Sequence, residues 1–374
     1  MSLSELLSGD RPPREREAGA ETSWTVYLGF VLLVLAVVGA VLFAMAPSPY
    51  VVERPGPAFD TLGEVENSDG DDVPLIDIPD ETTYPTSGEL NLLTVYLNGS
   101  RERPLTWLDV ASAWFDPSRS VLPIDAVYPD GQTDEEADEQ SAADMSNSQQ
   151  DAVAAALTEL GVDFGSVFVI SGVVDDTPAD GVLEADDEVL TADGIAVENV
   201  EELRAVLMDA GVGASVVLGI VRDGSELEVT VVLAAGSDGS PVIGVYGGTR
   251  YEEFPIDVNI QLENVGGPSA GMMFALGIYD KLTPGELTGG ENIAGTGTIV
   301  GTGEVGAIGG IIQKMYGARE AGADWFLAPV SNCDEVVGNI PSGIEVFAVS
   351  TLDDAISSIE AIADGDTAGL ARCS

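Results

Sequence analysis

The sequence contains no histidine in 374 residues, which excludes a Ser-His-Asp triad and every metal site built on imidazole ligands. Lysine is almost as scarce: Lys281 and Lys314 are the only two, and neither follows a glycine. A G-x-x-x-x-G-K-[ST] phosphate loop is therefore absent, and we expect no ATP-driven motor in the chain. We also predict that the protein uses no cofactor and no metal.

Positive charge is in short supply, with 14 basic residues against 64 acidic ones and a net charge of −50. Such a field repels phosphate backbones, so we expect no nucleic-acid partner.

Cys333 and Cys373 are too few for a disulfide framework or a four-thiolate zinc site. If the body lies outside the cytoplasm they can pair, and closing that loop would stabilise the fold by about 4 kcal/mol. The alternative is two unpaired thiols.

One long apolar run stands near the N-terminus. Residues 24–46 carry no charge and, as a helix, would span about 34 Å, enough to cross a hydrocarbon core of about 30 Å. The alternative is a cleaved signal peptide, because "AMA" resembles a cleavage site, but signal-peptide apolar cores run only about 7–15 residues. The length favours an uncleaved anchor, with the lipid bilayer as a partner.

The basic residues beside this run predict its orientation. Arg11, Arg14 and Arg16 precede it, whereas only Arg54 follows closely. By the positive-inside rule, residues 1–23 stay in the cytoplasm and the body lies outside it. We therefore predict a single-pass protein of the cell membrane.

The first part of the body mixes turn-rich and periodic segments. Residues 50–82 are rich in Pro, Gly and Asp, which indicates a linker with short extended pieces. The apolar run 88–97 predicts a strand, and 105–115 has helical spacing. The acidic run 129–144 predicts a mobile loop. Residues 146–160 predict a helix that is capped by a serine and ends at the next glycine.

From residue 167 the pattern becomes strand, turn, strand with an Asp-Gly turn, amphipathic helix and two alternating strands. Around the stretch "TPADGVLEADDEVLTADGIAVENVEELRAVL", this order resembles the circularly permuted bacterial PDZ domain over about residues 161–246. The resemblance implies binding of extended peptides or chain ends by strand addition. Residues 159–166 lie where the carboxylate-binding loop would fall. The alternative is a PDZ unit that acts only as a spacer or an intramolecular clamp.

The stretch "ENVGGPSAGMMFALGIYD", residues 263–280, delivers Ser269 to the start of a helix with no polar face. A serine after Gly-Pro is usually an ordinary helix cap. Free N–H groups at a helix start can also hold an oxyanion, so Ser269 is a candidate nucleophile.

Without histidine, a base for Ser269 must be a lysine or a carboxylate. Lys281 lies 12 residues along the same helix, roughly 18 Å away, and cannot reach. Lys314 lies on a predicted helix whose Ile311, Ala318 and Ala321 share its face, and desolvation there lowers a lysine pKa. The alternative is a lysine that extends its ammonium into water. From spacing alone, Thr296 or Thr298 can hold the amine.

The motifs "GGPSAG", "AGTGTI" and "GTGEVGAIGGIIQK" together resemble the proteolytic domain of Lon proteases, which use a Ser-Lys dyad. The resemblance implies that Ser269 is the nucleophile, Lys314 the base and Thr296 the residue that orients the lysine. Gly266 stands at an aspartate of the Lon motif, Asn259 at a histidine, and the ATPase half is missing. Because Lon-like domains often form rings, a homo-oligomer is compatible with the resemblance.

The predicted fold is α+β, with one transmembrane helix, a PDZ domain and a Lon-type α/β proteolytic domain into which the PDZ domain is inserted. The predicted proteolytic parts are residues 47–160, which include the linker, and 249–362. The PDZ domain occupies 161–248 between them, and 363–374 form a tail. We predict an ATP-independent serine endopeptidase that acts on unfolded or flexible envelope proteins. The rival interpretation is a catalytically silent peptide-binding scaffold.

Overall fold

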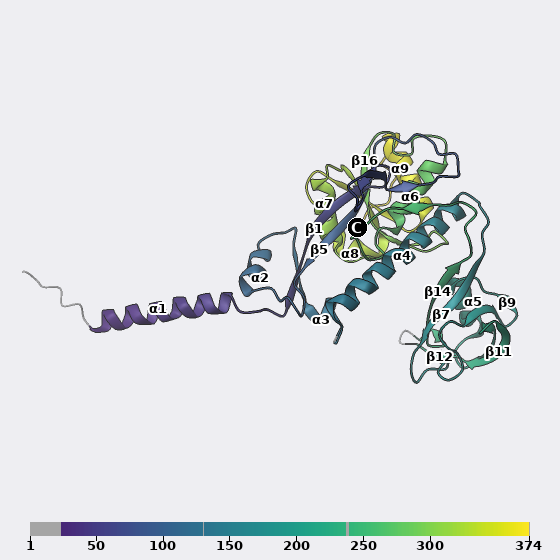
Figure 1. Cartoon of the computed structure of the whole chain (residues 1–374), viewed down its shortest axis with the longest axis horizontal. Coiled ribbons are helices and arrows are strands. Elements are labelled where there is room, and N and C mark those ends of the chain that lie inside the picture. The colour runs from purple at the N-terminus through teal and green to yellow at the C-terminus, as the bar shows by residue number, and fades with distance from the viewer. Residues whose placement is uncertain (1–23, 130, 237–238, 374) are drawn as a thin grey trace, which may run out of the picture.

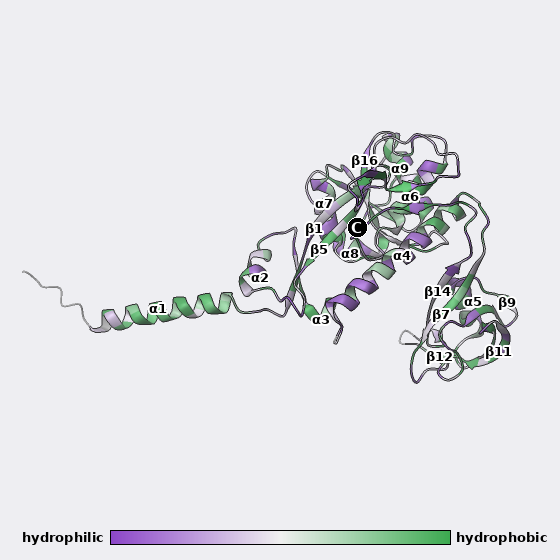
Figure 2. Ribbon diagram, in the orientation of Figure 1, coloured by the Kyte–Doolittle hydropathy of each residue, from purple (hydrophilic) through white to green (hydrophobic). Residues whose placement is uncertain are grey.

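A computed structural model describes residues 24–129, 131–236 and 239–373; the predicted tail 1–23, with Arg11, Arg14 and Arg16, lies outside these residues. Helix α1, Trp24–Ala44, extends away from the rest of the molecule (Figure 1) and is apolar along its length (Figure 2). Among the described residues it is the one helix long and apolar enough to cross a membrane, and its 19-residue stretch is not buried by the protein.

A six-stranded sheet forms the centre of the body, in the order β20-β19-β16-β5-β1-β6. Strand β1 runs antiparallel to both neighbours, whereas the strands from β5 to β20 run parallel. The bounds are β1 Tyr50–Asp60, β5 Glu89–Asn98, β6 Ser120–Pro123, β16 Asn292–Gly295, β19 Trp325–Pro329 and β20 Glu345–Val349. Strands β1, β5 and β6 thus precede residues 161–248 in the chain, and β16, β19 and β20 follow them. Residues 161–248 contribute no strand to this sheet.

Helices cover both faces of this sheet, because alternate strand residues point in opposite directions. Leu92 packs into the core shared with α4, α6 and α9, whereas Leu93 packs into the core shared with α7 and α8. The bounds are α4 Asp134–Glu159, α6 Gly271–Leu282, α7 Ile311–Glu320, α8 Cys333–Val336 and α9 Leu352–Ala363.

The linker predicted over 50–82 is wrong, because its first part is strand β1 at the heart of the sheet. The register shifts between Pro55 and Ala58, so that a bulge accommodates the Pro-Gly-Pro stretch that suggested a linker. Short pairs follow: β2 Glu64–Glu66 with β3 Asp72–Pro74, and β4 Ile76–Asp77 with β15 Asn259–Ile260.

The mobile loop predicted over 129–144 is also wrong for its larger part, which forms the first half of α4. Thr133 caps this helix, and Glu136 completes a capping box with it. Three acidic residues in the first turn interact favourably with the positive end of the helix dipole. The helix therefore begins at Asp134 rather than near Ser146, and it ends before a glycine as predicted.

Two other predictions for this region are confirmed. The strand predicted over 88–97 is β5, and the helical spacing of 105–115 corresponds to α2, Trp107–Ala113. A short helix α3, Ile124–Val127, follows β6.

A second unit with its own apolar core lies between α4 and α6 in the chain. Its sheet has the order β11-β10-β8-β7-β14, and helix α5, Val200–Ala210, buries Leu203 and Leu207 against it. The predicted Asp193-Gly194 turn is present, with φ of 49° and 78°. The bounds are β7 Ser166–Val173, β8 Glu188–Ala192, β9 Ile195–Ala196, β10 Ser215–Arg222, β11 Ser225–Val232 and β14 Val245–Tyr251, beside the short pair β12 Ala234–Ala235 and β13 Pro241–Val242.

The two cysteines form a disulfide, which decides between the two alternatives left by the sequence. Cys333 at the start of α8 is joined to Cys373, with 4.9 Å between their Cα atoms. The bond ties the C-terminal segment to the body.

Candidate active site

Helix α4 holds the loop that carries Ser269 through two hydrogen bonds. The amide of Gly267 donates to the carbonyl of Ser141 at 2.8 Å, and the hydroxyl of Ser148 donates to the carbonyl of Pro268 at 2.9 Å. Gly267 has a φ of 85°, a conformation that favours glycine. Two hydrogen bonds from one helix therefore set the path of the loop just before the candidate nucleophile.

Ser269, Thr296 and Lys314 come together in a closed set of contacts. Lys314 Nζ lies 2.5 Å from Ser269 Oγ and 2.9 Å from Thr296 Oγ1. Thr296 Oγ1 in turn donates to the carbonyl of Ser269 at 2.9 Å, and the amide of Gly297 donates to the same carbonyl at 3.0 Å. The structure thus brings together the three residues that the sequence selected, and Thr296 rather than Thr298 is the threonine at the amine.

Lys314 reaches this point from the first turns of α7. The helix starts after Gly310, which has a φ of 70° and whose carbonyl accepts the Lys314 amide at 3.0 Å. Ile311 and Ala318 are fully buried beside Lys314, as predicted, whereas Ala321 caps the helix and is exposed. The prediction for Ala321 is wrong because the helix ends one residue before it.

The amine of Lys314 is removed from water, with only 2% of the residue exposed. This burial lowers its pKa to about 7, against a smaller opposing effect of the Glu53 carboxylate on β1. Burial raises the pKa of Glu53 itself. A substantial fraction of the amine is therefore neutral near pH 7, which is the form that can accept a proton.

The backbone around Ser269 leaves two hydrogen-bond donors available. The amide of Met272 donates to the Gly297 carbonyl at 3.1 Å, so that donor of the helix start is already used. Within the described part of the chain, the amides of Ser269 and Ala270 donate to no protein acceptor. They are the amides next to Ser269 Oγ that can receive an oxyanion.

A groove of about 630 Å³ opens beside the three residues and includes both Ser269 and Lys314 in its lining. Its walls are largely apolar and come from β1, β5, α4 and the loop before α6. The apolar lining includes Phe59, Leu93, Met145 and Val265. The groove therefore has room for a peptide segment beside the serine hydroxyl.

Lys281 lies outside this group, as predicted. It stands near the end of α6, where the carboxylates of Asp60, Asp280 and Asp77 interact with it. Burial lowers its pKa, and these carboxylates act in the opposite direction. The protein therefore has one lysine among hydroxyls and one among acids.

The glycine in place of an aspartate has a steric explanation. A Cβ atom on Gly266 would lie 2.2 Å from the hydroxyl of Ser141 on α4 and 3.1 Å from its carbonyl. A side chain at this position would therefore require Ser141, which accepts the hydrogen bond from Gly267, to shift. Asn259 lies in β15, opposite Asp77 of β4, and is not among the residues lining the groove.

Sequence reasoning missed the contribution of α4. Ser141 lies in the acidic run that predicted a loop, and Ser148 was only part of a predicted alanine-rich helix. Their spacing could have indicated this contribution, because two serines seven residues apart in one helix lie on the same face and can contact the same loop.

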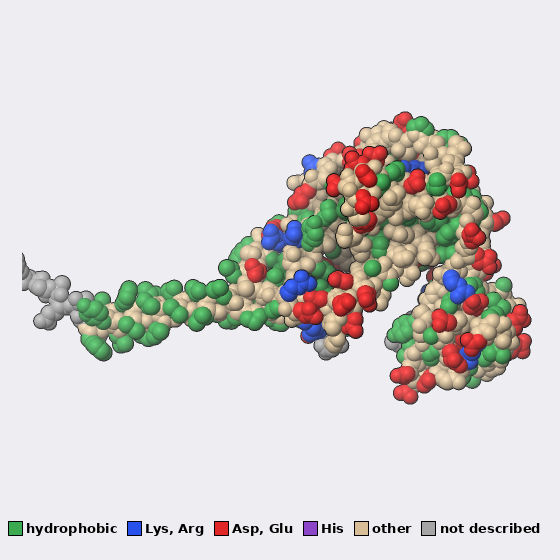
Figure 3. Space-filling model, viewed as in Figure 1, with side chains coloured by type: hydrophobic (Ala, Val, Ile, Leu, Met, Phe, Trp, Pro, Cys, Tyr) green, Lys and Arg blue, Asp and Glu red, His purple; other side chains and the backbone are tan. Residues whose placement is uncertain are grey.

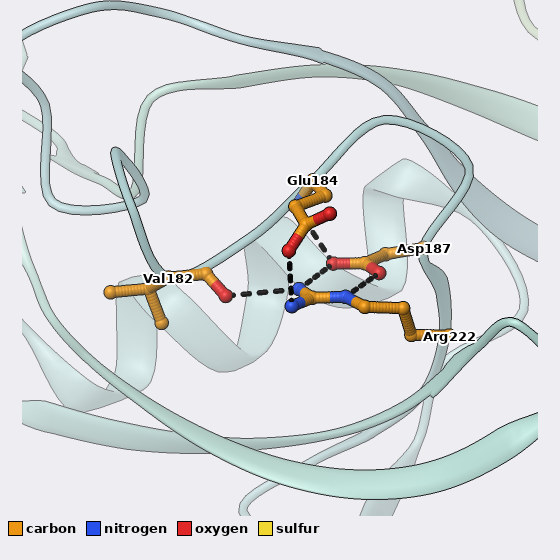
Figure 4. A network of polar contacts seen from close by, with 4 residues as sticks. All are labelled: Val182, Glu184, Asp187 and Arg222. Atoms are coloured by element: carbon orange, nitrogen blue, oxygen red, sulfur yellow. Dashed lines mark hydrogen bonds and ion pairs between the residues drawn. The ribbon is translucent and has the colours of Figure 1, made fainter.

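The second unit contains another basic residue among acids, Arg222 (Figure 4). Its guanidinium makes two bonds to the fully buried Asp187, at 2.7 and 2.6 Å, and a third to Glu184 at 2.7 Å. It also donates to the Val182 carbonyl at 3.0 Å. This cluster joins the turn before β8 to the end of β10.

Two family models match the chain. Residues 142–233 match the PDZ domain, and residues 253–361 match the Lon protease (S16) C-terminal proteolytic domain. The first match begins within α4 and ends before β14, although the sheet of the second unit continues to Tyr251.

Curated relatives resemble part of the chain. Lon protease 2 of Herpetosiphon aurantiacus is 31% identical over 153 residues, which are 39% of this chain and 18% of that protein. Lon protease 2 of Bacillus subtilis is 33% identical over 110 residues, 28% of this chain and 19% of that protein. The match thus spans less than a fifth of each relative. The solved PDZ domain of an SdrC-like protein from Listeria monocytogenes is 26% identical, covering 23% of this chain and 90% of that one, with a TM-score of 0.21.

Proposed function

We propose that this chain, which carries a PDZ domain and a Lon-type proteolytic domain, is a membrane-anchored serine endopeptidase that needs no ATP. Its catalytic groups would be Ser269 and Lys314. The observation that carries the proposal is the distance of 2.5 Å between Lys314 Nζ and Ser269 Oγ, in a setting that lowers the lysine pKa to about 7.

In the proposed reaction, neutral Lys314 accepts the Ser269 proton while Oγ attacks the carbonyl carbon of a peptide bond. The amides of Ser269 and Ala270 stabilise the oxyanion. Lys314 then gives its proton to the leaving amine, and an acyl-enzyme ester remains. Water hydrolyses that ester with Lys314 again acting as the base.

Thr296 would act as a positioning residue. Its hydroxyl bridges the Lys314 amine and the Ser269 carbonyl, so it fixes the distance between base and nucleophile. Lysine has several rotatable bonds, and such a bridge restricts the amine to one place.

The PDZ domain would capture chain ends or unstructured tails by strand addition. The interior position of β7 argues against residues 159–166 as the loop at the binding edge, because those residues lead into that strand. Strand β14 lies at an edge of the sheet and contacts α5, so the loop just before Val245 is the better candidate. Our proposed boundaries insert residues 161–248 into a proteolytic fold formed by 47–160 and 249–362.

The body would lie on the extracytoplasmic side of the membrane that α1 spans. The Cys333–Cys373 disulfide supports this side, since disulfides persist in oxidising compartments. Oligomer formation stays a prediction.

The test is cleavage of unfolded casein by the full chain in detergent without ATP. We expect the wild type to cleave casein, and Ser269→Ala to lose activity by about 10³-fold or more because no nucleophile remains. Ser171→Ala, an exposed serine of the PDZ domain, is the matched control and should retain full activity.

A fluorophosphonate probe should label the wild type and Ser171→Ala but not Ser269→Ala. If the wild type neither cleaves casein nor reacts with the probe, yet retains unfolded peptides in a pull-down, the scaffold interpretation replaces the protease.

A further inference from the structure

Helix α2 and the two residues after it expose large apolar side chains. Leu108 is 62% exposed, Trp114 is 62% exposed and Phe115 is 90% exposed. Aromatic residues make up only 6% of the sequence, so two exposed ones in succession are unusual for this chain. Leu108 and Phe115 are seven residues apart, which is two helical turns, so a helical path places them on one side.

The opposite side of α2 is attached to the body. Val110 and Ala113 are buried there. The side away from the body exposes Leu108 and Phe115 together with the polar Ser112, and Trp114 is exposed at the end of the helix, beyond the buried Val110 and Ala113.

Helix α2 is also fixed to the end of α1. The amide of Trp107 donates to the Ala46 carbonyl at 3.2 Å, and the amide of Ser48 donates to the Leu105 carbonyl at 2.8 Å. The rings of Phe43 and Trp107 stack with centroids 5.6 Å apart. Because Ala44 is the last residue of α1, these contacts hold α2 beside the point where the apolar helix ends (Figure 1).

The exposed apolar surface continues from α1 onto this part of the body. Figure 3 shows hydrophobic side chains along the whole α1 rod and on the region that adjoins its body-side end. Met45, between the two helices in the chain, is 68% exposed as well.

We propose that α2 is a second membrane contact, which lies in the headgroup layer of the bilayer that α1 spans and inserts Leu108, Trp114 and Phe115 into it. This inference rests on the anchoring part of the proposed function. Tryptophan and other aromatic side chains favour this layer, where one end of the ring is apolar and the other is hydrated.

The depth of α2 follows from its cap. The carboxylate of Asp109, next to Leu108, accepts from the amide and hydroxyl of Thr106 at the start of the helix. This carboxylate makes it costly for α2 to lie in the hydrocarbon core, whereas the headgroup layer can accommodate the charge. Two contacts, α1 and α2, would fix the tilt of the catalytic body on the membrane, which a single helix with a flexible connection would not.

The test uses the full chain in phosphatidylcholine nanodiscs with single cysteine labels. Both native cysteines are in the disulfide, so an introduced cysteine is the one reactive thiol. An environment-sensitive nitrobenzoxadiazole label is placed on Phe115→Cys, on Val34→Cys within α1, and on Val212→Cys as the control. Val212 is an exposed apolar residue of the PDZ domain. Each side chain replaced is at least two-fifths exposed, so folding should be preserved.

We expect lipids brominated near the headgroup to quench about half of the fluorescence at position 115, whereas position 212 keeps its full signal. Position 34 should be quenched by lipids brominated deep in the chains. Quenching at 34 without quenching at 115 would overturn the inference and leave the anchor standing. Absence of quenching at both positions would contradict the proposal that α1 spans the bilayer, and with it this inference.

A blue-shifted label at 115 that brominated lipid does not quench would mean that protein covers α2, and would also overturn the inference. Phosphatidylcholine suffices for the expected result, since apolar insertion rather than anionic lipid carries the contact.

Discussion

Two basic side chains in this protein meet their polar partners in opposite ways. Arg222 of the PDZ domain lies between Asp187 and Glu184, and each of its donor groups meets an acceptor. Lys314 of the proteolytic domain meets two hydroxyls, and it forms no ion pair within the described part of the chain. Its nearest acidic influence is Glu53, to which no hydrogen bond runs from the lysine.

The consequences for proton affinity differ accordingly. Although burial alone would raise the pKa of Asp187, its bonds to Arg222 and to the Glu184 amide lower it on balance, so this pair stays charged. Burial without a counter-ion lowers the pKa of Lys314 to about 7. A buried charge with a counter-ion stays ionised, whereas a buried amine without one gives up its proton more readily and can act as a base.

Replacement of the uncompensated lysine should have the largest effect. We expect Lys314→Met to reduce casein cleavage by about 10²–10⁴-fold, the usual contribution of a general base. The melting temperature at pH 7 should not fall, because methionine removes a desolvation penalty at a buried site.

The chain supplies one matched control, Lys281→Met, since no third lysine exists. This variant should keep its activity, because Lys281 lies among acids at the far end of α6. A large loss of activity in Lys281→Met, or none in Lys314→Met, would remove the distinction between the two sites.

Breaking the compensated pair should act on stability instead. Arg222→Met leaves Asp187 buried and unpaired, and we expect it to destabilise the PDZ domain by about 3 kcal/mol. Hydrogen exchange of residues 166–251 in the full chain measures this loss. Arg204→Met, an exposed arginine on α5, is the control and should change little.

Labelling of Ser269 by the fluorophosphonate probe should persist in Arg222→Met. Loss of labelling in that variant would show that the PDZ cluster serves the catalytic site after all, and the comparison would fail.

The smallest effect is the pH dependence that follows from the lysine pKa of about 7. Activity should fall about tenfold for each pH unit below that value, because only neutral Lys314 accepts the serine proton. The free energy of unfolding should also increase as pH rises. The ordinary lysine pKa of 10.5 is higher, so between about pH 7 and pH 10.5 the unfolded chain binds a proton that the folded chain does not, and unfolding becomes less favourable as pH rises through this window.

Subtracting the pH–stability curve of Lys314→Met from that of the wild type isolates this contribution. A difference that stays flat between pH 7 and 10 would contradict the lowered pKa.

The sequence predicted which side chains come together around Ser269 better than it predicted the supporting fold. Ser269, Thr296 and Lys314 were selected because a chain with no histidine and two lysines leaves few bases, and because three short motifs resemble one family. Helix starts and glycine turns are determined by a few neighbouring residues, so short motifs are enough to predict them. Which amides beside Ser269 stay available as donors depends instead on a distant contact, in which the Gly297 carbonyl accepts the Met272 amide. No local sequence pattern contains that information.

The two main misses have a common physical cause. The Pro-Gly-Pro stretch of β1 and the acidic start of α4 both look like exposed connections by composition. In the structure, a bulge absorbs the first, and a capping box with a favourable dipole stabilises the second. Tertiary packing against β5 and α6 then overrides the local preference.

The place of the PDZ domain within the chain has a consequence for how the sheet assembles. Strand β5 pairs with β16, which brings Leu90 beside Ile293 across some two hundred residues of intervening chain. Pairings this distant are slow to form, because a long loop must close first. The PDZ domain brings its own ends together, with the Glu252 amide donating to the Gly165 carbonyl at 2.8 Å. Once it has folded, that loop becomes a much shorter connection, so we expect earlier folding of the inserted domain to speed the pairing of β5 with β16.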